Sequence, residues 1–305
     1  MSTLLVCADE ADDPRVARYV SAAEGHGMRP LVVTSARQLP TDVAPARGVV
    51  AVTHSASALA AEVAALVGAP WHDQAAVDVT DSRLSLLGRL TAAGIPVPRF
   101  AAIDAASGEG IERLATLPAP WHVSARVPAR RTQVDGLSGL EALASHWLAD
   151  HNRHGDPEVL MLAVEPVLTG QQWLVVGLLH AGALRVVGVV QHGDATVAYE
   201  GHVWLVSPAR LSRAQQGHLA GLVSRACAAA GLRQGPVVAT ACATEGQVCL
   251  TNLQAGPFEA PGSDVLALVD PSLLPVSFEH LVVRHALGVS IESYAIVAEE
   301  RRLRV

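Results

Sequence analysis

Short apolar runs alternate with amphipathic stretches along the first eighty residues. The runs are only a few residues long and rich in Leu and Val, which is typical of strands buried on both faces. The amphipathic stretches repeat apolar positions at helical spacing, and one begins at Pro14 after Asp12 or Asp13, either of which can cap it. Strands that alternate with helices in this way indicate a small parallel sheet with helices on its faces. The predicted strands are residues 4–7, 31–34 and 49–53, and the predicted helices are residues 14–25 and 57–67.

The remainder of the chain alternates longer strands with helices. The most apolar stretch, residues 173–190, is interrupted by His180, Gly182 and Arg185. It therefore predicts a β-hairpin over residues 173–191 rather than a membrane span of ~20 apolar residues. A serine at position 212 and a glycine at position 231 bound a long amphipathic helix. The other predicted strands are 100–103, 159–168, 196–206, and an antiparallel pair at 236–241 and 247–253, and the other predicted helices are 81–90 and 275–287.

The stretch from Pro120 to Leu143 combines several of these signals. A strand over residues 121–126 is followed by the loop Pro128-Ala129-Arg130-Arg131, and Ser138 can cap the helix that comes next. A loop between a strand and a helix often holds phosphate, because backbone N–H groups point outward there. Here arginines stand where a phosphate cradle has glycines, and they favour an anion unless they simply face solvent. The candidate anion-binding residues are Arg126, Arg130 and Arg131.

Composition narrows the possible functions. The 305 residues are 50% hydrophobic and carry a net charge of −7, which predicts about two globular domains and no general nucleic-acid surface. All 22 basic residues are arginine, so no step can use a lysine amine as a Schiff base or as a compact phosphate ligand. The four cysteines have no Cys-x-x-Cys spacing and lie in apolar runs, which predicts buried free thiols. With no recognisable signal sequence, we expect a cytoplasmic protein.

The segment DSRLSLLGRLTAAGIPVPRF, residues 81–100, resembles ATP-grasp proteins, and the resemblance continues through most of the remaining chain. It implies an α/β fold in which a small N-terminal doubly wound domain precedes ATP-grasp-like α+β subdomains. It also implies ATP-dependent joining of a carboxylate to an amine through an acyl phosphate, with ATP and Mg²⁺ as cofactors if the protein is active and none otherwise. The implied division is 1–80 for the N-terminal domain, 81–168 for the small subdomain and 169–305 for the C-terminal subdomain.

The resemblance assigns nucleotide-binding roles to several positions. Ser82 and Ser124 stand where the family has lysines, and Arg126 lies two residues further along the same strand face as Ser124. The segment 164–172 falls where the family has its adenine-linker motif, with Glu165 kept and Gln172 in place of a glutamate. The implied nucleotide-binding residues are Arg126, Arg130, Arg131, Glu165, Val167 and Gln172.

The implied metal site departs furthest from the family pattern. Asn252 and Gln254 occupy the positions of its metal-binding segment and share one strand face, but neutral amides are weak substitutes for carboxylates on Mg²⁺. The preceding strand offers no acid near residues 240–241. The nearest acids are Glu245, Glu259 and Asp264, of which Glu259 could approach the site or simply be a solvated turn residue.

Some of the thirteen histidines suggest further sites. His72 lies in the linker after the first domain, and His202 follows a segment that faces the nucleotide cleft by analogy, so both are candidate substrate residues. His151 and His154, with Asp156, have a spacing that could ligate zinc, although the sequence nominates no further ligand. Structural roles are the simpler alternative for all of them.

Two functions remain open at this point. The chain is either a non-catalytic or partner-dependent relative of carboxylate–amine ligases, with impaired or altered nucleotide chemistry, or an active divergent ligase in which arginine replaces lysine. The loss of both the glycine loop and the metal carboxylates favours the first. We expect a small carboxylate or amine substrate or a protein partner, a possible homodimer, and no nucleic-acid or membrane partner.

Overall fold

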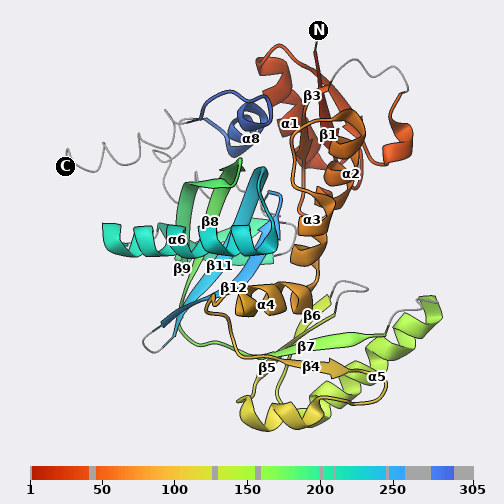
Figure 1. Cartoon of the computed structure of the whole chain (residues 1–305), viewed down its shortest axis with the longest axis vertical. Helices are drawn as coiled ribbons and strands as arrows, with labels where there is room; N and C mark the ends of the chain where they lie inside the picture. Colours follow the sequence, from red (N-terminus) through yellow and green to blue (C-terminus); the bar gives the residue numbers. More distant parts are fainter. Residues whose placement is uncertain are drawn as a thin grey trace. The chain divides into compact units, whose positions relative to one another are not determined.

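The structure is a computed structural model that describes residues 2–40, 46–125, 130–154, 159–199, 202–208, 211–244, 247–257 and 276–291. Contacts divide the chain into two compact units (Figure 1). The first comprises residues 1–78, 171–241 and 252–305, and the second comprises residues 79–170 and 242–251. The first and the last described segments of the chain therefore share one unit, while the three-part division expected from the sequence stays a prediction.

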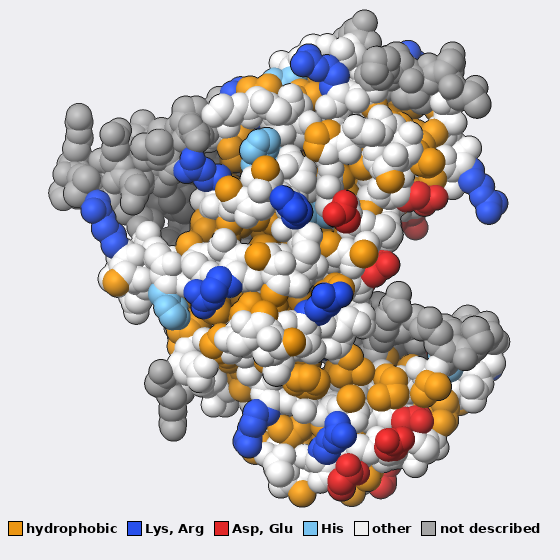
Figure 2. Space-filling view, viewed as in Figure 1, with side chains coloured by type: hydrophobic (Ala, Val, Ile, Leu, Met, Phe, Trp, Pro, Cys, Tyr) orange, Lys and Arg blue, Asp and Glu red, His pale blue; other side chains and the backbone are white. Residues whose placement is uncertain are grey.

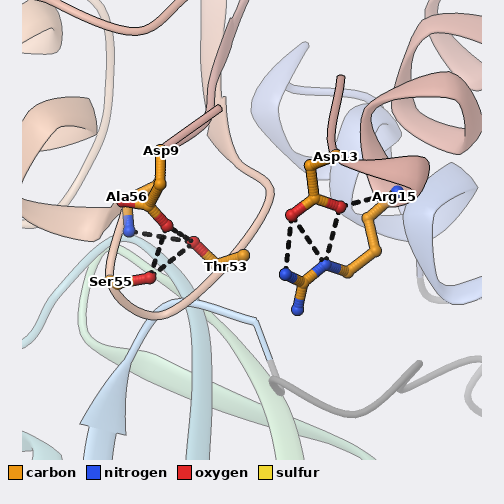
Figure 3. Close-up of polar contacts among 6 residues, drawn as sticks. All are labelled: Asp9, Asp13, Arg15, Thr53, Ser55 and Ala56. Carbon is orange, nitrogen blue, oxygen red and sulfur yellow. Dashed lines mark hydrogen bonds and ion pairs between the residues drawn. The ribbon is translucent and has the colours of Figure 1, made fainter. Parts of the chain in front are cut away.

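The first unit contains a parallel sheet of β1 (Thr3–Cys7), β2 (Arg29–Val33) and β3 (Ala46–Ala51), in the order β2-β1-β3. It confirms the parallel sheet predicted from the sequence. Helix α1 (Pro14–Gly25) starts at the predicted Asp13, whose Oδ1 accepts from the Arg15 N–H at 2.8 Å while its Oδ2 pairs with the Arg15 guanidinium at 2.6 Å (Figure 3). Because the carboxylate serves both the helix end and Arg15, burial of this cap leaves no uncompensated charge.

Helix α2 (Ser57–Val67) begins in a different way. Ala56 precedes it and has no side chain to cap it, so the Thr53 hydroxyl accepts from the Ala56 N–H at 3.0 Å (Figure 3). Thr53 and Ser55 both donate to one oxygen of Asp9, at 2.9 and 2.5 Å. The carboxylate thereby links the residues that follow β1 to those that follow β3. Gly68 ends the helix in the left-handed conformation.

A five-stranded antiparallel sheet follows, in the order β10-β9-β8-β11-β12. The predicted hairpin is confirmed as β8 (Gln171–His180) and β9 (Ala183–Tyr199), and Ser212 and Gly231 bound helix α6 (Arg213–Ala230) as expected. The single strand predicted over 196–206 is wrong, because β9 ends at Tyr199 and β10 (His202–Pro208) pairs back on it. Both strands continue one β-favouring pattern, so periodicity alone concealed the reversal. The remaining strands are β11 (Gly235–Thr244) and β12 (Gln247–Ala255).

The second unit is built on an antiparallel sheet in the order β4-β7-β5-β6. Its strands are β4 (Ala101–Asp104), β5 (Trp121–Ala125), β6 (Arg130–Val134) and β7 (Met161–Pro166). Among the described residues, three helical elements lie wholly in this unit: α4 (Arg83–Ala92), a 3-10 turn at Ile111–Thr116 and α5 (Leu137–His154). The sheet's apolar side chains form one core with α5, which includes Val123, Leu162 and Trp147.

Three predictions fail in this region. The loop expected at residues 128–131 is partly strand, because Arg130 and Arg131 begin β6 and pair with Ala125 and Ser124 of β5. The helix expected over 81–90 is interrupted at Ser82, which separates α3 (Gln74–Asp81) from α4. Ser82 is extended, and its hydroxyl accepts from the Ser85 N–H at 3.4 Å, so the serine caps the second helix instead of lying within it. Helix α5 likewise begins at Leu137, one residue before the expected Ser138 cap.

Helix α8 (Phe278–Ala286) completes the core of the first unit. Its side chains Phe278, Leu281 and Val282 belong to one apolar cluster with residues of β1, β3 and β8. Gly48 of β3 permits the close approach, since a Cβ there would lie 2.7 Å from the Ala286 carbonyl oxygen. Among the described residues, no helix is long and apolar enough to cross a membrane.

We expect Gly48→Ala to lower the free energy of unfolding by about 1–3 kcal/mol, because the added methyl group must push backbone away from backbone. Gly217→Ala is the matched control, because Gly217 is exposed on α6 with open space around it, and it should raise stability by about 0.5–1 kcal/mol. Urea unfolding of both variants checks this. An unchanged Gly48→Ala midpoint would contradict the tight packing of α8.

Candidate functional site

One face of the four-stranded sheet is polar. Side chains alternate along a strand, so Trp121 and Val123, which lie in the core, leave His122 and Ser124 on the opposite face. The register places Glu165 of β7 opposite His122 and Arg131 of β6 opposite Ser124. Directly opposed residues share a face, so the sheet order brings these four side chains together from three strands.

Glu165 is the most buried charged side chain of this face, with 1% of the residue exposed. Arg83, near the start of α4, holds it with two hydrogen bonds: Nε donates to Oε2 at 2.7 Å, and Nη2 donates to Oε1. The side chain of Arg83 is itself only 11% exposed. A planar guanidinium against a carboxylate is the strongest form of ion pair, and it compensates the cost of burying this carboxylate.

Arg131 adds a second guanidinium to the same face. Its Nη2 donates to His122 Nδ1 at 3.1 Å, so Nδ1 is the unprotonated nitrogen of that ring. Burial and the charge of Arg131 lower the pKa of His122, which keeps the ring neutral at pH 7. The pKa of Arg131 is also lowered, first by burial and then by Arg83, although the residue keeps part of its surface in solvent. Arg83, Arg131 and Glu165 together leave one net positive charge.

A cavity of about 250 Å³ opens beside the ion pair of Arg83 and Glu165. The Ser124 hydroxyl faces it, and the residue is only 6% exposed. Within the described ranges this hydroxyl has no hydrogen-bond partner, which is unusual for a buried polar atom and leaves it able to bond to a ligand atom. The cavity is lined by Ser82, Arg83, Ser85, Ser124, His151 and Met161, among others.

The structure brings together only part of the predicted nucleotide site. Glu165 and Arg131 lie on the polar face, whereas Arg126 lies outside the described residues and Arg130 is described only by its backbone in β6. The Val167 N–H donates to the Pro120 carbonyl at 2.8 Å, so this donor already has an acceptor. The last predicted member, Gln172, is exposed at the start of β8 and belongs to the other unit.

The predicted metal residues lie on one face of β12. Asn252 and Gln254 are half-buried, while Leu253 between them is fully buried, as the predicted alternation requires. Across the part of the chain that the structure describes, no three His, Cys, Asp or Glu side chains are grouped to hold a metal ion. Two neutral amides do not balance the charge of Mg²⁺, so the described donor set does not fit the ion.

The predicted histidines have different surroundings. His72 is 2% exposed, and its Nε2 lies 3.0 Å from the Pro236 carbonyl oxygen, so a substrate role for it stays a prediction. The side chain of His202 lies outside the description, although its backbone is in β10. His151 is buried and lines the cavity beside Ser124, while the side chain of His154 and all of Asp156 are outside the described residues.

Sequence reasoning missed Arg83, Ser85 and His122. Arg83 and Glu165 are 82 residues apart, so no local pattern connects them. The only available signal was the segment that begins at Asp81, where Arg83 follows the position of a family lysine. His122 could have been found by the period-two alternation that also selects Ser124.

No protein-family model matches the chain, and no curated protein matches its sequence. Solved structures do match its fold. An L-amino acid ligase from Bacillus licheniformis is 17% identical, with a TM-score of 0.72, covering 96% of this chain and 77% of that chain. A D-alanine–D-alanine ligase from Bacillus anthracis in complex with ATP is 9% identical, with a TM-score of 0.70, covering 98% and 99%.

A third structure, carboxyaminoimidazole ribonucleotide synthase from Aspergillus clavatus in complex with ATP, is 14% identical. Its TM-score is 0.69, and the match covers 96% of this chain and 79% of that chain. These likenesses show that the chain has the ATP-grasp fold of carboxylate–amine ligases, as the sequence resemblance predicted.

We expect Glu165→Leu or Arg83→Met alone to lower the free energy of unfolding by about 3 kcal/mol, because each leaves one buried charge without its partner. The double variant should lose less unfolding free energy than either single variant, since two apolar side chains replace both charges. Urea unfolding of the three proteins gives the coupling energy. Strictly additive losses would show that the two charges do not depend on each other.

Stability should also depend on pH through His72. Burial lowers its pKa from 6.5 to about 4, so the unfolded chain binds the proton more tightly than the folded one. The stabilising contribution is complete above pH ~6.5 and is lost as pH falls toward 4, by about 2 kcal/mol between pH 7 and pH 5. His72→Gln keeps a donor for Pro236 but cannot titrate, so it should reduce this loss. Urea unfolding at pH 7 and pH 5 measures the loss of stability between these pH values. If His72→Gln loses as much stability as the parent protein, the assignment of this loss to His72 is wrong.

Proposed function

We propose that this chain, which has the fold of ATP-grasp ligases, binds ATP with impaired or altered chemistry and acts as a non-catalytic or partner-dependent relative of the carboxylate–amine ligases. Its arginines would hold the phosphates in place of lysines. The ligand would lie on the polar face of the four-stranded sheet. This proposal rests on the chemistry of that face and on the donor set of β12.

The observation that carries the proposal is the buried hydroxyl of Ser124. It lacks a partner among the described residues and faces a cavity that Arg83 also lines. A hydroxyl donor next to a guanidinium suits an anionic oxygen, and Arg131 adds a second guanidinium on the same face. An anion here would satisfy the hydroxyl and offset the excess positive charge.

The donor set of β12 supports the loss of ligation. Forming an acyl phosphate brings a carboxylate oxygen against a triphosphate, and this needs carboxylate-bound Mg²⁺ or an equivalent cation to offset the repulsion. Asn252 and Gln254 supply amide oxygens instead. A protein of this kind would act by binding ATP, and a protein partner or a second copy of the chain would bind according to whether ATP is present.

An active divergent ligase is the second candidate. A solved L-amino acid ligase matches the fold over 96% of this chain, which favours this second candidate. The buried acid Glu165 also keeps the residue type of the motif that the resemblance assigns to this position. Its substrates would be a small carboxylate and an amine.

In both cases we place the protein in the cytoplasm, because all four cysteines are free and buried. The face drawn in Figure 2 shows separated arginine side chains rather than a continuous basic stripe among its described residues, so nucleic acid is not among the proposed partners.

Calorimetric titration of ATP tests the proposal. We expect binding that changes less than about two-fold with Mg²⁺, and that weakens about tenfold in Arg131→Gln, since one charge-assisted hydrogen bond is worth about 1.5 kcal/mol. Arg113→Gln is the matched control in the same unit, because the Arg113 side chain is 66% exposed and lies outside the polar face. Absence of binding to the parent protein would refute the nucleotide role.

A parallel assay separates the two candidates. ADP release is measured with Mg²⁺ and mixtures of amino acids, and the proposal expects none above background. Release that requires both Mg²⁺ and a carboxylate would establish the active ligase instead. If it occurs, Arg131→Gln should reduce it together with ATP affinity.

A further inference from the structure

The first unit contains a second cavity, of about 410 Å³, remote in sequence from the polar face. It lies where the β8–β9 hairpin meets the end of α8. His180 and Ala183, which flank the turn of that hairpin, and residues 288–291 after α8 border it. All of its lining residues belong to one unit, so its shape does not depend on how the two units are arranged.

His285 is the distinctive residue of this cavity. It is 7% exposed, and the Leu179 backbone accepts a hydrogen bond from its ring. Its Nε2 is buried and has no partner within the described chain, so Nδ1 is the nitrogen that donates to Leu179. Burial, reinforced by His180, lowers the pKa of His285 to about 4. At pH 7 the ring is therefore neutral, and its Nε2 carries a lone pair that can only accept.

The remaining lining divides into an apolar part and a polar part. Leu178 and Ile291 are buried, and Val289 is 40% exposed. The guanidinium side chain of Arg185 is the cationic group of the lining. The His180 ring stands edge-on to His285, with centroids 5.8 Å apart and planes at 88°. The cavity thus offers an aliphatic wall, one buried acceptor and one cation.

We infer that this cavity binds a short aliphatic carboxylate that also carries a hydroxyl or amino group. The aliphatic chain would lie against Leu178 and Ile291, and the hydroxyl or amino group would donate to His285 Nε2. The carboxylate would face Arg185. A ligand without the donor would leave the buried lone pair unsatisfied, which costs affinity even when the apolar contacts are the same.

A metal ion fits this cavity less well. Two imidazoles lie next to each other, and a ring that donates to a backbone carbonyl is typical of metal-binding histidines. However, His180 and His285 have no third His, Cys, Asp or Glu grouped with them among the described residues, and Arg185 repels a cation. The experiment therefore includes a metal.

The test compares three probes of the same carbon skeleton by calorimetry: 4-methylpentanoate, 2-hydroxy-4-methylpentanoate and leucine. We expect the hydroxy acid or leucine to bind at least tenfold more tightly than 4-methylpentanoate, and whichever of the two binds more tightly identifies the donor. Arg185→Gln changes an exposed side chain and should weaken the better ligand about tenfold without unfolding the protein. Arg213→Gln, exposed on α6, is the matched control and should have no effect.

His285 is tested by two substitutions. His285→Gln keeps an acceptor and should retain part of the donor preference, whereas His285→Phe should abolish that preference while circular dichroism shows a folded protein. If His285→Phe does not fold, the glutamine variant and Arg185→Gln still decide the question. The same titrations in Arg131→Gln should be unchanged, so failure of the proposed ATP site and failure of this site are distinguishable.

Three results would overturn the inference. The first is that no probe binds at concentrations up to about 10 mM, where a ligand of millimolar Kd is detected. The second is that all three probes bind equally, which would remove the role of the lone pair. The third is that Zn²⁺ binds to the parent protein but not to His285→Phe and blocks binding of every probe, which would make the cavity a metal site.

Discussion

The buried pair of Arg83 and Glu165 is the constraint on which the second unit depends. A carboxylate that is 1% exposed is tolerated only when a cation and hydrogen bonds compensate its lost hydration, and Arg83 supplies both. The pair links the start of α4 to β7, and so fixes the helix on the sheet. It also defines the polar face, because the guanidinium lines the same cavity as the Ser124 hydroxyl.

The first unit is held by apolar contact instead. Helix α8 comes from the end of the described chain, yet its side chains share a core with β1, β3 and β8. The absence of a side chain at Gly48 lets α8 approach β3 closely. The cavity at His285 is a consequence of the same packing, since the end of this helix delivers the imidazole to the β8–β9 hairpin.

Arginine-only chemistry gives the candidate site its character. A guanidinium is planar, always charged and suited to bidentate contacts, so it can anchor a carboxylate and an anionic ligand on one face. It cannot act as a titratable amine. Neutral amides stand at the predicted metal positions, so the proposed nucleotide affinity and nucleotide turnover are separate questions for this chain.

Local pattern determined much of this protein. The parallel sheet, the caps at Asp13 and Ser212, the ends at Gly68 and Gly231, and the buried thiols all follow from neighbouring residues, because capping and periodicity act over a few positions. The resemblance at residues 81–100 also led to the fold that the solved structures support. The alternation of β5 placed Ser124 opposite the core.

Only the tertiary structure decided which of these residues meet. The antiparallel pairing of β10 on β9, the strand β6 and the break at Ser82 depend on pairing and capping partners that the local pattern leaves open. Sheet order brings Glu165 opposite His122 of β5, and the packing of α4 against β7 brings Arg83 to Glu165. The physical reason is that each strand can pair on either edge, and burial of the whole apolar face selects one order.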